Sequence, residues 1–348
     1  MIKDYIKKIG RGKGAGQYLT LEEAESAMNH ILSGDASEAQ ISAFLMLLRY
    51  REESVEEIAG FVKACRRHNP HKDQISTTID LDLPVYAGKR RHIPWMLLAV
   101  FVLAQQGKKI FLHGTQEPDS KRLYVEDVLQ QFGFKPATTA KQIDSQLQMF
   151  GFSYANLHYL NPNLDKLIQM RSFLGLRSCA NTLARMINPL AASVSVQGVY
   201  HKGLDTRHSK VACTLADPRI AVFRGEGGEN ECNPERPFTL ITTKTESMDM
   251  LECPALLGQW AIKPKSMNVQ ELKRFWCEDD TGNLKCTGNI EGIGKAEESV
   301  PNTEYAFAAV IGTLTILLIA LDNITFDDAK EKAINLWHSR NKAWPLHN

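Results

Sequence analysis

The chain has 348 residues, more than one hydrophobic core usually holds, so we expect two domains or one large α/β unit with an added lobe. Its composition, 43% hydrophobic and 23% charged, is that of an ordinary soluble globular protein, and no internal repeat or low-complexity tail is visible. The net charge of +1 by itself indicates no polyanionic partner.

The first segment, to about residue 70, has the pattern of short amphipathic helices. Helix starts with the capping-box spacing occur at Thr20, Asp35 and Ser54, each followed by a Glu three residues later. Helices this short need a partner surface, so we predict a helical lobe that ends near Asn69-Pro70.

From about residue 76, strand and helix patterns alternate, which predicts a mainly parallel sheet covered on both faces. Residues 225–302 give the least clear pattern. We assign the helices at 163–174 and 178–187 to the helical lobe, so the predicted domains are 1–72 plus 160–188 and 73–159 plus 189–348. The other expected elements are strands at 79–83, 109–112, 194–199 and 220–223 and helices at 95–106, 124–132 and 141–150.

One run, residues 305–321, has no charge and is at the short edge of a membrane span. We interpret it as a buried helix packed on the sheet, because the rest of the chain is polar, and expect no membrane association. No signal peptide is visible at the basic N-terminus, so the expected location is the cytoplasm.

Positive charge is concentrated in three segments, with net charges of +4 in residues 1–16, +5 in residues 83–116 and +6 in residues 166–210, which leaves −14 for the remainder. Such segregation permits a basic surface on a nearly neutral protein if the segments meet in space. Lys and Arg bind nucleic-acid phosphates independently of sequence. The candidate phosphate-binding residues are Lys7, Lys8, Arg11 and Lys13, then Lys89, Arg90, Arg91 and His92, with Lys202, Arg207, His208 and Lys210 as additions.

The turn from Tyr86 to His92 follows a predicted strand and opens a predicted helix. In a sugar-phosphate enzyme this turn would be small, glycine-rich and acidic at its end. Here it is basic, so it still attracts phosphate but lacks the carboxylate for metal-assisted chemistry. No base-reading motif is visible, although Tyr86, Trp95 and Tyr5 are of the type that stacks on unpaired bases.

Two stretches carry a family resemblance. Residues 19–66 resemble the opening helices of anthranilate phosphoribosyltransferase, a member of glycosyltransferase family 3, and residues 170–200, MRSFLGLRSCANTLARMINPLAASVSVQGVY, are similar to a second stretch of that family. The resemblance implies a nucleoside phosphorylase/phosphoribosyltransferase-like fold. It also implies a small helical lobe, a large α/β domain, a cleft between them, and a homodimer formed through the lobe.

The functional motifs of that family are altered in this chain. Its Gly-Thr-Gly-Gly-Asp phosphate loop falls at 86–90, its Lys-His-Gly-Asn-Arg segment at 112–116, and its metal-binding Asp-Glu pair at Asn230-Glu231. We therefore expect no catalytic residue, no cofactor and no metal. The remnants of the family site are Gly88, His113, Gly114, Arg171, at the position that contacts the aromatic acid, and Glu231.

The run 9–13, Ile-Gly-Arg-Gly-Lys, and the turn 86–90 resemble more specifically the subgroup typified by the YbiB protein, whose members are DNA-binding homodimers. The resemblance implies a cytoplasmic homodimer that binds DNA or RNA without strong sequence preference. The alternative is a diverged family 3 enzyme, a phosphoribosyl or pentosyl transferase with an unknown substrate. A third hypothesis is a small-molecule sensor that keeps the aromatic-acid pocket near Arg171.

Overall fold

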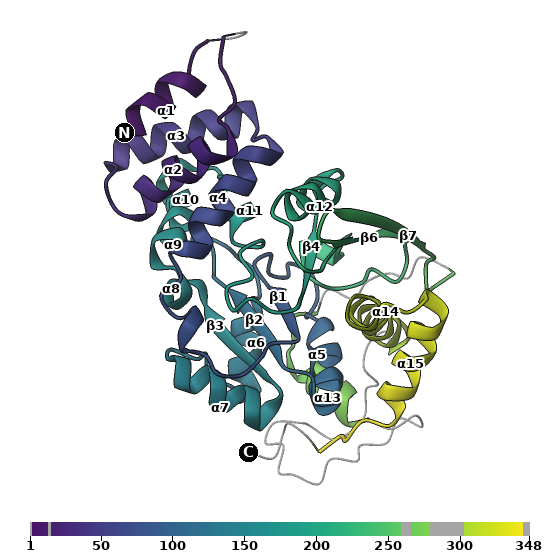
Figure 1. Ribbon diagram of the computed structural model, residues 1–348. Helices are drawn as coiled ribbons and strands as arrows, with labels where there is room; N and C mark the ends of the chain where they lie inside the picture. Colours follow the sequence, from purple (N-terminus) through teal and green to yellow (C-terminus); the bar gives the residue numbers. More distant parts are fainter. Residues whose placement is uncertain (1, 13–14, 259–265, 279–302, 344–348) are drawn as a thin grey trace.

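A computed structural model describes residues 2–12, 15–258, 266–278 and 303–343. It contains a helical lobe stacked on an α/β domain (Figure 1). This is the predicted fold class.

The lobe combines helices from two separate parts of the chain. Leu164 and Leu183 share one hydrophobic core with Met28, Phe44 and Phe61, so the later segment packs on the N-terminal helices. This packing is compatible with the two-segment lobe, whose boundaries stay a prediction. The helices are α1 (Ile2–Ile9), α2 (Leu21–Leu32), α3 (Glu38–Arg51), α4 (Val55–Arg67), α8 (Leu157–Leu160), α9 (Pro162–Gln169), α10 (Arg171–Leu174) and α11 (Ala180–Leu183).

Two of the three predicted capping boxes are confirmed. Thr20 caps α2 and Ser54 caps α4, each with reciprocal hydrogen bonds to a Glu three residues later. The predicted start at Asp35 is wrong, because Ser37 and Gln40 form the box of α3 two residues further on. Asp35 lies in the preceding turn, with its carboxylate 3.3 Å from His30.

The α/β domain is built on one seven-stranded sheet with the order β3-β2-β1-β4-β5-β6-β7. The first five of these strands pair in parallel, and β6 and β7 add an antiparallel hairpin at one edge. The sheet is therefore mainly parallel, as predicted. The strands are β1 (Leu81–Pro84), β2 (Ile110–Gly114), β3 (Phe152–Asn156), β4 (Val194–Val199), β5 (Ile220–Arg224), β6 (Phe238–Lys244) and β7 (Ser247–Cys253).

The apolar run at 305–321 forms α14 (Thr303–Asp322), which packs against α5 (Met96–Gln105) and α15 (Phe326–His338). By length and composition α14 could cross a membrane, but 83% of its most apolar window is buried inside the protein, as the predicted core helix requires. The remaining elements are α6 (Val125–Gln131), α7 (Ala140–Phe150), α12 (Leu204–Thr214), α13 (Gln270–Cys277), and the short 3-10 helices η1 (Lys72–Gln74) and η2 (Glu226–Gly228).

Candidate functional site

The candidate site lies at the carboxyl edge of the parallel strands, where open α/β sheets bind their ligands. Residues 85–95 follow β1, residues 115–124 follow β2, and residues 225–237 follow β5. Hydrogen bonds link the first of these loops to each of the other two, so the three loops meet. Side chains of α10 and the residues after it reach the same loops from the helical lobe.

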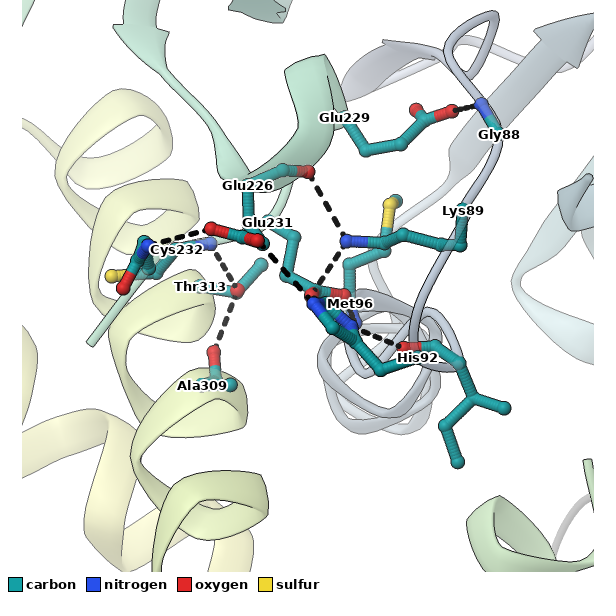
Figure 2. Close-up of polar contacts among 12 residues, drawn as sticks. Gly88, Lys89, His92, Met96, Glu226, Glu229, Glu231, Cys232, Ala309 and Thr313 are labelled. Carbon is teal, nitrogen blue, oxygen red and sulfur yellow. Dashed lines mark hydrogen bonds and ion pairs between the residues drawn. The ribbon is translucent and has the colours of Figure 1, made fainter. Parts of the chain in front are cut away.

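Lys89 is buried in an ion pair at this edge. Its Nζ lies 2.7 Å from Glu231 Oε1 and donates a hydrogen bond to the Glu226 carbonyl at 3.2 Å, and its side chain is 3% exposed (Figure 2). Glu231 Oε2 accepts from the Met96 backbone N–H, in the first turn of α5. Lys89 was expected to meet an external phosphate, but in this conformation the ammonium and the helix amide are both held by Glu231.

His92 faces the same carboxylates. Its Nε2 lies 3.3 Å from Glu226 Oε1 and its Nδ1 lies 3.9 Å from Glu231 Oε1, and the side chain is buried. His92 is therefore also not presented to solvent as a phosphate contact. Arg90 and Arg91, between these two buried residues, are exposed.

The turn at Gly88 is closed by another acid. The Gly88 N–H donates to Glu229 Oε1 at 2.5 Å, and Gly88 has a φ of 64°, which glycine adopts without strain. Glu229 is buried, and this burial raises its pKa, while the positive charge of Arg185 opposes the shift.

Asn230 holds the backbone of the loop in place. Its Nδ2 donates to the Pro84 carbonyl at 3.0 Å, and its Oδ1 accepts from the Gly198 N–H. One bond needs a donor and the other an acceptor, so an amide satisfies both and an ionised carboxylate would satisfy only one. Within the described residues, no three His, Cys, Asp or Glu side chains are arranged to hold a metal ion.

His113 belongs to a buried polar chain beneath the site. Its Nδ1 lies 2.8 Å from the Tyr86 hydroxyl and its Nε2 lies 3.0 Å from Asp82 Oδ1, while the Ser195 hydroxyl donates to Asp82 Oδ2 at 2.7 Å. Burial raises the pKa of Tyr86, and the nearby Asp82 charge adds to the shift. These polar contacts link β1, β2 and β4. Tyr86 is therefore fixed in the core and is not exposed for base stacking.

Gly114 and Trp95 are also explained by packing. At Gly114, an added Cβ would lie 2.5 Å from the Val85 carbonyl oxygen, so only glycine fits beside that backbone. Trp95 is in the core, as expected, where its ring packs edge-on against Phe275 with centroids 5.4 Å apart.

Arg171 points into a second cluster, centred on Glu117. Glu117 Oε2 accepts from Arg171 Nη1 at 2.5 Å and from Arg177 Nη2 at 2.6 Å, and Oε1 accepts from Asn181 Nδ2 at 2.8 Å. Sequence reasoning did not single out Glu117, Arg177 or Asn181, because nothing in their spacing indicates that they converge.

Arg122 extends this cluster toward the turn after β1. Its Nη1 donates to the Ala87 carbonyl. Partial burial lowers the pKa of Arg122, and the positive charges of Arg177 and Arg90 lower it further, so both of these groups lie within electrostatic range of Arg122. Arg122 was also missed, since it is an isolated arginine in its segment.

The remaining candidates lie apart from this cluster. Lys7 and Arg11 are exposed, Lys8 forms an ion pair with Glu23 at 2.5 Å, and Lys13 lies outside the described residues. Helix α1 packs on α2 and α3, at the end of the lobe farthest from the sheet (Figure 1). The N-terminal basic segment therefore does not join the loop after β1 on one surface of the chain.

On α12 and the turn before it, Lys202 and Lys210 are exposed. Arg207 pairs with Glu52 at 3.2 Å. His208 is buried against Gln197, its Nδ1 lying 2.8 Å from Gln197 Oε1, and burial lowers its pKa to about 3. His208 is therefore a neutral core residue and does not contribute positive charge to a phosphate site.

Comparisons with known proteins agree with the fold. The model of the helical bundle domain of the glycosyl transferase family matches residues 3–69, and that of its a/b domain matches residues 95–258. The crystal structure of anthranilate phosphoribosyltransferase from Thermus thermophilus aligns over 99% of this chain and 96% of its own, with a TM-score of 0.75 and 20% identity.

Two curated relatives are similar in sequence. YbiB of Escherichia coli, described as uncharacterized, is 26% identical over 249 residues, 71% of this chain and 77% of YbiB. Anthranilate phosphoribosyltransferase of Pelotomaculum thermopropionicum is 30% identical over 255 residues, 71% of this chain and 70% of the relative. The chain therefore belongs to glycosyl transferase family 3, the family of the anthranilate phosphoribosyltransferases.

Proposed function

We propose that this protein binds the phosphate backbone of DNA or RNA without strong sequence preference, on a transferase scaffold that has lost its phosphoribosyl diphosphate and magnesium sites. The observation that carries the proposal is the buried Lys89–Glu231 pair. The Lys89 ammonium lies beside Glu231, the carboxylate to which the family resemblance assigns metal binding.

The donor set does not fit a magnesium ion. Asn230 lacks the charge of the aspartate expected at its position, and its side chain is bonded to the Pro84 and Gly198 backbone. A metal at Glu231 would also have to displace the Lys89 ammonium. We therefore derive no reaction step through a metal at this site.

The loop amides are likewise occupied by acids of the chain. Glu229 accepts from Gly88 and Glu231 accepts from Met96, so a pyrophosphate would have to displace two buried glutamates from these backbone donors. Placing its negative charge near them is unfavourable. This arrangement supports the loss of the sugar-phosphate site.

Positive charge remains on the rim of the site. Arg90 and Arg91 are exposed, and Arg122 and Arg177 are partly exposed nearby. One guanidinium group can bind two phosphate oxygens at once, and it stays charged at any working pH. Such contacts with the backbone carry no base information, which is the reason for proposing sequence-independent binding.

The test is fluorescence anisotropy with labelled single-stranded and duplex oligonucleotides across a salt series. We expect binding that weakens steeply with salt, because each phosphate contact contributes about −0.9 to the log–log slope on duplex DNA. Arg90→Glu with Arg91→Glu should weaken binding and reduce the slope by about 2, one unit for each lost contact.

The matched control is Lys135→Glu with Lys141→Glu, which changes the net charge equally. Both lysines are exposed: Lys141 lies in the first turn of α7, which packs on the edge strand β3 (Figure 1), and Lys135 lies five residues before this helix. Equal losses in the two double variants would mean that binding follows net charge alone and would refute the assignment of the site.

The alternative is a diverged phosphoribosyl or pentosyl transferase, favoured by the 30% identity to an anthranilate phosphoribosyltransferase. In that case oligonucleotide binding is weak even at low salt, and the Arg90/Arg91 variant alters a phosphate-dependent activity. Turnover of phosphoribosyl diphosphate with aromatic acids, measured as pyrophosphate release, would establish the alternative.

A further inference from the structure

Glu117 is held like a bound ligand. Its side chain is 3% exposed, and both carboxylate oxygens accept hydrogen bonds from residues more than fifty positions away in the chain. Arg171 and Arg177 share Oε2, and Asn181 binds Oε1. Two guanidinium groups and an amide thus surround one carboxylate.

The arginines that bind Glu117 can also donate hydrogen bonds to a second acceptor. The side chains of Arg171 and Arg177 are 31% and 41% exposed, so both guanidinium groups also border solvent. Arg177 Nε is buried and has no hydrogen-bond partner among the described residues. A buried N–H without a partner costs free energy, so this donor favours an additional oxyanion contact.

The charges around Glu117 do not balance. Arg122 experiences repulsion from Arg177 and Arg90, and Glu117 is the carboxylate that offsets part of it. Arg171 and Arg177 both contact the single Glu117 carboxylate, so two guanidinium charges share one carboxylate charge. An external anion of the right shape would therefore be attracted to the same groups.

We propose that Arg171, Arg177 and Asn181 form an oxyanion site whose resting occupant is Glu117, and that a phosphate group of the nucleic acid takes the place of this carboxylate. Carboxylate and phosphate offer guanidinium groups the same paired oxygens. The identification of the ligand as nucleic acid rests on the proposed function. The existence of the oxyanion site does not.

Glu117 sets the affinity of this site. An internal carboxylate competes without the entropy cost of association, so its effective concentration is high and small anions bind poorly. Removing its charge frees two guanidinium groups for external phosphate. Glu117 thus weakens the binding of the wild-type chain to phosphate ligands.

The first measurement uses inorganic phosphate and needs no nucleic acid. Phosphate binding to the full chain is measured by calorimetry and by thermal shift for wild type and Glu117→Gln. We expect the variant to bind phosphate at least about tenfold more tightly, the worth of one charge-assisted hydrogen bond. Glu117→Ala is the second variant. It also removes the bulk of the side chain, and it replaces Glu117→Gln in the measurement if the Gln side chain still fills the site or if the Gln variant does not fold.

Asp119→Asn is the matched control. Asp119 is exposed, lies two residues from Glu117, and has a φ of 55°, which asparagine tolerates well. The Asp119→Asn substitution removes the same charge at nearly the same place, but it leaves Arg171 and Arg177 bound to Glu117. If Asp119→Asn strengthens phosphate binding as much as Glu117→Gln, or if neither Glu117 variant gains affinity, the inference is wrong.

The second measurement repeats the oligonucleotide salt series. Glu117→Gln should bind more tightly than wild type, with a slope steeper by about 1–2, because up to two more cations contact duplex phosphates. If the wild type does not bind oligonucleotides, the proposed function is refuted. The oxyanion site is not, because the phosphate measurement tests it separately. Oligonucleotide binding with an unchanged slope in Glu117→Gln would refute the exchange and leave the proposed function standing.

Discussion

Replacing Lys89 with methionine tests the buried ion pair directly. Methionine has nearly the same length but lacks the charge and the N–H donors of lysine, so Glu231, which is fully buried, loses its ammonium partner, and the Glu226 carbonyl loses a hydrogen bond. Breaking a buried pair from one side costs about 3–5 kcal/mol, because the remaining charge is uncompensated. At about 2–4 °C per kcal/mol, the midpoint of thermal unfolding should fall by roughly 6–20 °C.

The pH dependence of this loss identifies its cause. Without Lys89, Glu231 is a buried carboxylate with no ammonium beside it, and this is unfavourable only while the carboxylate carries its charge. The loss of stability should therefore be larger at neutral pH than in acid. Urea denaturation of wild type and variant at several pH values measures the difference.

Two further variants complete the test. Lys89→Met with Glu231→Gln should recover most of the stability, because neither member of the pair then carries a charge and the Gln oxygen still accepts from Met96. Lys141→Met, at an exposed position, should have little effect. A Lys89→Met variant that loses less than about 1 kcal/mol at neutral pH, with no pH dependence, would refute the reasoning, since surface pairs contribute that little.

Burial lowers the pKa of His208 to about 3, so the fold keeps its imidazole neutral, whereas the unfolded chain binds a proton below about 6.5. Its contribution to stability is complete above pH 6.5 and falls by about 1.4 kcal/mol per unit toward pH 3, and His208→Gln should remove this slope from denaturant titrations. In α14, Gly312→Ala would place a Cβ 2.6 Å from Cys232 Sγ and 2.7 Å from Leu256 Cδ1, and should lower the free energy of unfolding by about 1–3 kcal/mol in urea titrations. Removing the Thr313 hydroxyl with valine leaves the buried Cys232 N–H without its acceptor (Figure 2), and should cost about 1–3 kcal/mol in the same assay, whereas an unchanged stability would mean that another acceptor replaces it.

Most of the parallel core of the fold was predictable because its strands are rich in apolar residues and buried. The strand at 194–199 was placed with its observed ends, and the helix at 95–106 within one residue of α5 at each end, since all of β4 and the positions from Met96 to Ala104 are buried. The parallel edge strand β3 and the hairpin of β6 and β7 were missed. Strand β7 lies at the sheet edge with most of its side chains exposed or partly exposed, so it lacks the apolar run that marks a central strand.

The candidate site was predictable only as a region. The turn at 86–92 and position 231 were both singled out, but the ion pair between Lys89 and Glu231 joins residues 142 positions apart. Counting charges along the chain treats Lys89 as a free cation, whereas the fold places it against a carboxylate. Glu117 was missed for the same reason, because its partners come from a distant helical segment.

The Lys89–Glu231 pair also constrains how this sequence can evolve. Mutating either residue alone leaves one buried charge uncompensated, so each single replacement in the pair passes through a less stable protein. Asn230 adds a further constraint, because its amide bridges two backbone groups. Selection against unstable intermediates therefore favours keeping the pair, because replacing it without a loss of stability requires both residues to change together.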